Sequence, residues 1–196
     1  MRPLIAAARL LGAANGWLLG IGRVLGCAAI AAMVAATLLQ VFCRYVLGNA
    51  LPWPDEAARF CMLWMTGLMA PAAFRAGGFV AIDSLDALLP GLASRLLQLA
   101  FLAISMAVLV TGAKIGWKEV TGIGGRFATA SLYVPLSLSF DQWHRVPRSW
   151  MMLSLLVGIW LLLLVNAELI LRRIVALMGG EAGLPPIAEL GHEGAE

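Results

Sequence analysis

The sequence has little charge for its length, and this scarcity alone excludes several classes of protein. Only 13% of its 196 residues are charged, whereas 61% are hydrophobic, and the mean hydropathy is +0.88. A soluble domain of this size needs more charge to cover its surface, so the composition indicates a membrane protein. The basic residues behind the net charge of +3 are spread along the chain. Nucleic-acid-binding proteins concentrate such residues in a patch, so we expect no nucleic acid partner.

Histidines, cysteines and catalytic motifs are also scarce. Cys27, Cys43 and Cys61 lie in apolar segments without metal-ligand spacing, which is typical of small buried side chains. His144 falls in a predicted loop and His192 in the tail, so no histidine is placed to hold a haem inside the membrane. The chain has no HExxH, GxSxG or P-loop motif either. We therefore expect no enzyme activity, no cofactor and no bound metal.

Long apolar runs are what the sequence has in abundance. A helix needs about 20 apolar residues to cross the hydrocarbon core of a bilayer. Four segments are candidates, although the second is free of charge only from Phe60 to Phe74 and becomes long enough only with the charged residues at its two ends. Pro54 followed by Asp55 marks a helix start, because an acidic group favours the positive end of the helix dipole. Glu168 precedes Arg172 by four residues, the favourable order for a helical ion pair. We predict an all-α membrane protein with a single membrane domain over residues 1–178. Its transmembrane helices are expected at about residues 24–43, 54–75, 95–114 and 149–171.

The segments outside these spans are predicted to be interfacial or irregular. Arginines recur at multiples of seven residues near the N-terminus, at Arg2, Arg9 and Arg23. This spacing favours an N-terminal amphipathic helix on the membrane surface. We predict a short interfacial helix and turn over residues 76–94 and a loop over residues 129–148. The tail, residues 179–196, holds Pro, Gly and Glu with few large apolar groups, so we expect it to be disordered.

Ionisable residues are absent from the middle of the four apolar runs. Transport and proton-relay sites place such residues inside the membrane, and transporter cores often show paired broken helices or inverted repeats. Because the sequence has neither, it favours a subunit that supports another membrane protein. A stand-alone homo-oligomeric channel or exporter is the main alternative, and a haem-bearing anchor of a membrane enzyme is the third. Basic residues divide equally between the two sides, so the positive-inside rule leaves the orientation open.

The stretch from Val41 to Ser84 holds most of the polar residues of the first half of the chain. In order and spacing it resembles the small membrane subunit (DctQ type) of tripartite ATP-independent periplasmic transporters. In that family an Arg-Tyr pair ends the first span, a Trp and a Glu open the second, and an Arg and an Asp follow it. The matching residues here are Arg44, Tyr45, Trp53, Glu56, Arg59, Trp64, Arg75 and Asp83.

This resemblance implies a scaffold subunit of a sodium-driven uptake transporter, with four helices in the bacterial inner membrane and both termini in the cytoplasm. It implies two protein partners, a large membrane subunit that carries the substrate and a soluble periplasmic substrate-binding protein. Phospholipid is the third expected partner. Substrates of the family are mostly organic acids, such as dicarboxylates and sialic acids.

Charged residues at the start of the second span form the first candidate site, namely Arg44, Asp55, Glu56 and Arg59. Their spacing allows an ion network that fixes the first two helices and contacts the large subunit. The alternative is ordinary solvated charge at the membrane surface. Trp53 and Trp64 are amphipathic residues that suit a membrane boundary.

Two further groups are candidates. Arg75 and Asp83 either form an anchor pair or contact lipid headgroups, or Arg75 simply extends its charge to the membrane surface. Basic residues of the second half form either a docking surface for the periplasmic protein or ordinary surface charge. These residues are Lys118, Arg126, Arg145 and Arg148.

Overall fold

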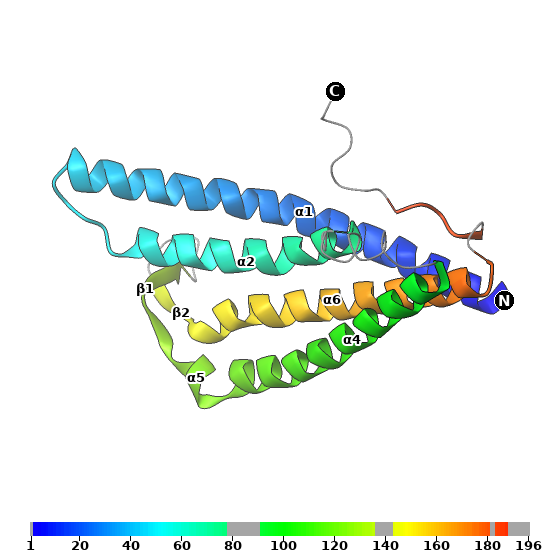
Figure 1. Cartoon of the computed structure of the whole chain (residues 1–196). Helices are drawn as coiled ribbons and strands as arrows, with labels where there is room; N and C mark the ends of the chain where they lie inside the picture. The colour runs from blue at the N-terminus through cyan, green and yellow to red at the C-terminus, as the bar shows by residue number, and fades with distance from the viewer. Residues whose placement is uncertain (1, 78–90, 136–142, 181–182, 188–196) are drawn as a thin grey trace, which may run out of the picture.

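The computed structural model describes residues 2–77, 91–135, 143–180 and 183–187. Four long helices make up most of this described part (Figure 1): α1 (Arg2–Tyr45), α2 (Trp53–Arg75), α4 (Gly91–Thr121) and α6 (Arg148–Leu177). Each is long and apolar enough to cross a membrane. The prediction of an all-α membrane protein with four spanning helices is confirmed. α1 and α4 extend well beyond the predicted spans.

The helices lie side by side in an open layer, in the order α1, α2, α6, α4 (Figure 1). α2 and α6 occupy the middle, α1 packs mainly against α2, and α4 packs mainly against α6. We call the end where α1 begins and α6 ends the terminal end, and the opposite end the loop end (Figure 1). The two border helices keep large apolar side chains exposed, including Trp17, Val24, Ile104 and Val108.

α1 is one continuous helix of 44 residues, so the predicted amphipathic helix is the first half of the same helix that contains the first span. Its buried residues are separated alternately by four and three positions through much of its length: Ala8, Gly12, Asn15, Leu19, Gly22 and Gly26. This spacing is typical of helices that interlock side chains along a narrow seam. Arg9 and Arg23 each follow a seam residue by one position and are exposed.

α2 and α6 approach so closely near Gly67 and Gly158 that their backbones are in contact. A Cβ atom added to Gly158 of α6 would lie 2.8 Å from the carbonyl oxygen of Gly67 in α2, and one added to Gly67 would collide with the Ser154 carbonyl oxygen. Pro71 is buried in the same helix as Gly67 and has no amide hydrogen to offer that carbonyl. Small residues therefore allow the two central helices to approach closely, as is common in membrane helix packing.

Within the predicted loop over residues 129–148, the described residues form a pair of antiparallel strands, and residues 136–142 lie outside the described part of the chain. After the short helix α5 (Ile123–Arg126), strand β1 (Ala128–Pro135) pairs with β2 (Trp143–Pro147). Ala128 lies opposite Pro147, and Tyr133 lies opposite Arg145. The Thr129 hydroxyl, which is buried, donates to the Val146 carbonyl at 2.8 Å. β-branched and aromatic residues favour such pairing, but Pro135 and Pro147, which end the two strands, favour a loop in the sequence because proline cannot donate to a strand ladder.

The remaining predictions fall partly outside the described residues. Of the interfacial helix expected over residues 76–94, residues 78–90 are not described, and α4 begins at Gly91. Of the tail, residues 179–180 and 183–187 are described. Arg9 of α1 donates to the Gly183 carbonyl at 2.8 and 2.6 Å, and Arg172 of α6 donates to the Pro185 carbonyl at 2.7 Å. This part of the tail therefore lies against the helices.

Candidate functional site

A buried carboxylate ties three helices together at the terminal end. Glu168 of α6 is completely buried. Arg75, the last residue of α2, donates from Nε to Oε2 of Glu168 at 2.9 Å and from Nη2 to Oε1 at 2.8 Å. Asn15 of α1 donates to Oε2 at 2.8 Å. Arg172, one turn farther along α6, donates to Oε1 at 2.9 Å. We call these four residues the Glu168 cluster.

The cluster also satisfies backbone groups around it. Arg75 donates to the Gly12 carbonyl at 2.9 Å, and Asn15 donates to the Leu164 carbonyl at 3.2 Å. A Cβ atom at Gly12 would lie 2.9 Å from Oε1 of Glu168, so glycine is what lets α1 approach the carboxylate. A buried charge is tolerated when it is both paired and hydrogen-bonded, and Glu168 meets both conditions. The cluster therefore fixes α1, α2 and α6 relative to one another.

The sequence predicts this cluster only in part. The pair between Glu168 and Arg172 follows from helical spacing and is present at 2.9 Å. For Arg75 the sequence leaves three possibilities open: an anchor pair with Asp83, a contact with lipid headgroups, or a charge that only extends to the membrane surface. Asp83 lies outside the described residues, and the ion-pair partner of Arg75 in the described part of the chain is Glu168. Sequence reasoning missed Asn15. The available signal was a lone amide in an otherwise apolar, glycine-rich stretch of helix.

Glu56 fastens the β-hairpin to the start of α2 at the loop end. Its Oε1 accepts a hydrogen bond from the Ala130 amide at 2.9 Å, and its Oε2 accepts one from the Ser131 amide at 2.5 Å. The Ser131 hydroxyl lies 2.6 Å from the same Oε2 and 2.9 Å from the Pro52 carbonyl oxygen. We call this arrangement the Glu56 latch. It joins α2 to a strand that follows about 75 residues later in the chain.

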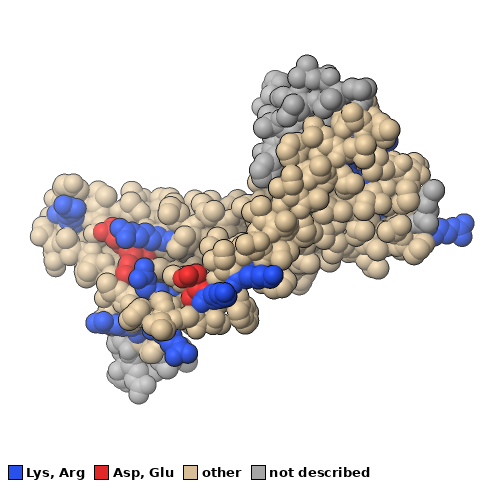
Figure 2. Space-filling model, turned by 60° about the horizontal axis from the view of Figure 1, so that its bottom comes forward, with Lys and Arg blue, Asp and Glu red and all other residues tan. Residues whose placement is uncertain are grey.

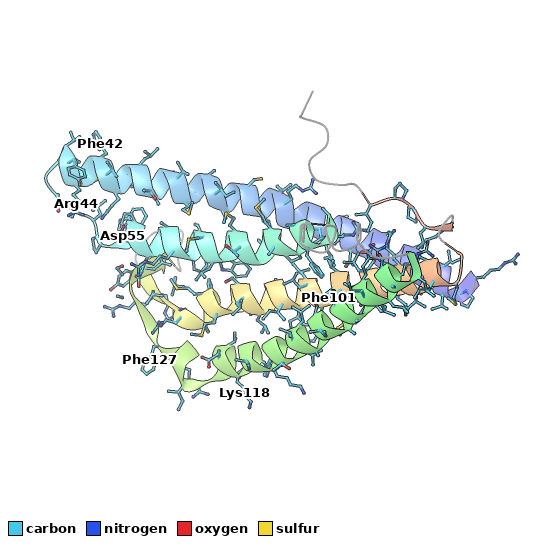
Figure 3. The ribbon with its side chains drawn as sticks, in the orientation of Figure 1. Phe42, Arg44, Asp55, Phe101, Lys118 and Phe127 are labelled. Carbon is cyan, nitrogen blue, oxygen red and sulfur yellow. The ribbon has the colours of Figure 1, made fainter. Side chains whose placement is uncertain are left out.

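Glu56 thus has partners other than the expected ion network. Arg44, Asp55, Glu56 and Arg59 are all described, and the ion pairs found in the described residues involve none of them. The guanidinium of Arg44 lies 5.9 Å from the centre of the Tyr45 ring, and Arg44 and Asp55 both lie at the loop end (Figure 3). The N–H groups of a strand are already ordered, so they bind the carboxylate without immobilising a long arginine side chain.

The predicted aromatic residues divide between two environments. Tyr45 and Trp53 lie at the loop end and are 76% and 39% exposed, which suits side chains at a membrane boundary. Trp64 lies farther along α2, with its ring centre 6.2 Å from that of Phe60. Its indole N–H is buried without a hydrogen-bond partner in the described part of the chain.

The four basic residues predicted for docking all lie toward the loop end, on or beside the hairpin. Lys118 is in the last turn of α4, Arg126 ends α5, and Arg148 begins α6. Arg145 of β2 donates to the Tyr133 hydroxyl at 2.8 Å and lies over that ring at 5.3 Å. Figure 2 shows charged side chains gathered toward this end of one face, and Figure 3 places Lys118 at the border of the layer formed by α4.

Comparison with models of known protein families identifies the family of the chain. A family model for the DctQ component of tripartite ATP-independent periplasmic transporters matches residues 33–176, from the second half of α1 through nearly all of α6. The chain belongs to this family. No curated protein and no solved structure matches the chain.

As a DctQ component, the chain is a small multi-pass membrane subunit of a transporter, and its family is not an enzyme family. The family's partners are a large membrane subunit and a substrate-binding protein. The matched region includes the Glu56 latch and three residues of the Glu168 cluster, whereas Asn15 lies before it. The cluster thus joins the part of α1 that precedes the matched region to helices inside it.

Proposed function

We propose that the chain is the scaffold subunit of a sodium-driven uptake transporter for organic acids such as dicarboxylates or sialic acids. It assembles with a large membrane subunit that carries the substrate, and a periplasmic protein delivers that substrate. Membership of the DctQ family is the observation that carries this proposal. Coupling to sodium and the class of substrate are expected from the same family.

The polar side chains buried between the helices bond to other helices of the same layer, and this supports a scaffold role. Glu168, Arg75 and Asn15 bind one another and the neighbouring backbone, and Asn166 of α6 donates to the Leu102 carbonyl of α4 at 3.1 Å. These groups hold helices together, and the border helices α1 and α4 expose broad apolar surfaces. A rigid layer of this kind widens the footprint of a moving partner in the bilayer and holds it in place.

The same proposal gives an orientation. With both termini in the cytoplasm, the loop end faces the periplasm of the bacterial inner membrane. Lys118, Arg126, Arg145 and Arg148 then form the docking surface for the periplasmic protein. Charge reversal at Arg126 and Arg148 should slow association with that protein, and the effect should shrink as salt is raised, because electrostatic steering is screened by salt. Equal association rates at low salt for the variant and the unmodified transporter would contradict this docking surface.

Co-purification with the large membrane subunit tests the assembly. The chain carries the tag, both proteins are expressed together, and the pair is extracted in mild detergent. A stable complex of the two is expected. A chain that elutes alone as a homo-oligomer would favour the channel or exporter alternative.

Replacement of Glu56 or Arg44 tests the predicted interface with the large subunit. We expect Glu56→Ala and Arg44→Ala to reduce recovery of the complex while the substrate preference of any remaining transporter stays unchanged. An intact complex with unchanged uptake in both variants refutes the interface role of these residues.

A further inference from the structure

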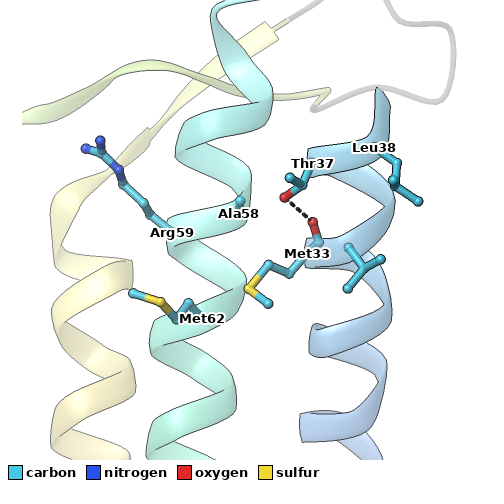
Figure 4. Close-up of a pocket in the computed structure, with 7 residues that line it drawn as sticks. Met33, Thr37, Leu38, Ala58, Arg59 and Met62 are labelled. Atoms are coloured by element: carbon cyan, nitrogen blue, oxygen red, sulfur yellow. Dashed lines mark hydrogen bonds between the residues drawn. The ribbon is translucent and has the colours of Figure 1, made fainter. Parts of the chain in front are cut away.

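α1 and α2 leave a groove between them in the half of the layer nearer the loop end (Figure 4). Its volume is about 360 Å³, and its walls are four side chains of α1 and three of α2: Met33, Val34, Thr37 and Leu38, and Ala58, Arg59 and Met62. The hydroxyl of Thr37 donates to the Met33 carbonyl of its own helix at 2.9 Å. With that hydroxyl already bonded, the groove offers an incoming group apolar walls and one cation.

That cation, Arg59, has no described partner. Its side chain is exposed, and it makes no ion pair or hydrogen bond within the described residues. Arg59 lies six residues after Trp53, the first residue of α2, which is about 9 Å along the helix. Figure 4 shows its guanidinium on the side of α2 away from α1, directed toward the end that carries the β-hairpin, so the stem of Arg59 lines the groove and the charge lies at its rim. A long side chain can thus keep its charge at the polar boundary while its stem lies on apolar surface.

We propose that this groove binds a phospholipid, with an acyl chain between α1 and α2 and the phosphate on Arg59. The two parts of the lipid match the two parts of the site, because the walls are apolar and the unpaired charge lies toward the polar boundary. Exposed Tyr45 and Trp53 lie at the same end of these helices and mark where headgroups are expected. A guanidinium binds phosphate oxygens well, since its donors match their geometry.

The size of the groove favours a lipid chain over a partner helix. Its volume of about 360 Å³ is at the lower end of the range for pockets that hold small molecules. A helix with side chains is about 10–12 Å across, so it would rest on the rims instead of filling the space. A carboxylate on the large subunit is the competing partner for Arg59, and the experiment below separates the two.

Native mass spectrometry of the full chain in mild detergent tests the site, with phosphatidylglycerol and diacylglycerol as separate probes. Arg59→Gln should lower the affinity for phosphatidylglycerol about fivefold, the effect of one basic group near a lipid phosphate, and leave diacylglycerol binding unchanged. Val34→Trp, which puts a bulky side chain into the groove wall, should lower binding of both probes. The matched controls are Arg23→Gln and Leu25→Trp, exposed positions of α1 that do not line the groove, and they should leave both affinities unchanged.

Two outcomes overturn the proposal. One is equal phosphatidylglycerol binding by Arg59→Gln, Val34→Trp and the controls. The other is unchanged lipid binding by Arg59→Gln together with loss of co-purification with the large subunit, which would assign Arg59 to a protein partner. Both tested side chains are exposed, so the variants should fold, and a single symmetric elution peak checks this.

Discussion

The terminal end and the loop end of the layer are each held by one glutamate, but the two glutamates have different partners. Glu168 is fully buried and is neutralised by two arginine side chains with an amide beside them. Glu56 is half-buried and is held by backbone N–H groups and a serine hydroxyl of the hairpin. The first arrangement joins three long helices, and the second attaches a short hairpin to one helix.

Because the partners differ, removal of the Glu168 charge should lower the free energy of unfolding more than removal of the Glu56 charge. Loss of one partner from a buried ion cluster leaves the other charges uncompensated and typically costs about 3–5 kcal/mol. Loss of a carboxylate that binds N–H groups near water costs less, because water can replace part of the lost bonding. The terminal end should therefore control the stability of the whole layer, and the loop end should control the order of the hairpin.

The largest effect is expected for Glu168→Gln. It leaves Arg75 and Arg172 facing each other without a counter-charge, so the free energy of unfolding should fall by about 3–5 kcal/mol. The midpoint of thermal unfolding in mild detergent measures this loss. Glu119→Gln, at an exposed position near the end of α4, is the control and should shift the midpoint little. Equal midpoints for the two variants would show that the cluster does not hold the layer.

Gly67→Ala tests the close backbone contact between α2 and α6 separately from the polar contacts of Glu168 and Glu56, because Gly67 lies between the two ends of the layer. The added methyl group collides with the Ser154 carbonyl oxygen of α6, and such overpacking typically costs about 1–3 kcal/mol. Unfolding midpoints provide the readout. Gly20→Ala is a matched control in α1, because nothing lies within 4 Å of its added Cβ, and it should stabilise the helix slightly. If both substitutions behave alike, the close crossing of α2 and α6 is not needed for stability.

Glu56→Gln should act locally at the loop end. The amide side chain keeps one acceptor oxygen but loses the charge, so we expect a loss of about 1–2 kcal/mol confined to the hairpin. Hydrogen exchange at the amides of Ala130 and Ser131 should accelerate while the unfolding midpoint changes little. Asp55→Asn, at the exposed neighbouring position, should leave exchange unchanged. A fall in the midpoint as large as that of Glu168→Gln would remove the distinction between the two ends.

The smallest effect is expected for Arg9→Gln. It removes two hydrogen bonds to the Gly183 carbonyl at an exposed site, which should cost less than about 1 kcal/mol. We expect the Arg9→Gln variant to be cleaved by protease faster near residues 183–187 than the unmodified protein, with an unchanged midpoint of thermal unfolding. Arg23→Gln, on the same exposed side of α1, is the control. Equal cleavage rates in the two variants would show that Arg9 does not hold this segment.

The sequence predicts the helices well because each span is a local property. A run of about 20 apolar residues is sufficient to predict a helix across the membrane, and the pairing of Glu168 with Arg172 follows from a spacing of four residues. The family is also predictable, since the residues that carry the resemblance all lie in one stretch of the chain, from Arg44 to Asp83. These features can be predicted without knowing which helices are neighbours in the structure.

Contacts between distant segments could not be predicted in the same way. Arg75 and Glu168 are 93 residues apart, and hydropathy does not reveal that α2 and α6 share the middle of the layer. The sequence places Glu56 in an ion network, whereas in the structure Glu56 accepts hydrogen bonds from the amides of Ala130 and Ser131. These amides belong to β1, and the prolines that end both strands favour the loop that the sequence predicts there.

Reconstitution of uptake is the most direct test of the scaffold role. The large membrane subunit is placed in proteoliposomes with and without this chain, together with the substrate-binding protein, an organic acid and a sodium gradient. We predict sodium-dependent uptake only when this chain is present, and a strong reduction with Glu168→Gln. Equal uptake by the large subunit alone would contradict the proposal that this DctQ component is the scaffold on which transport depends.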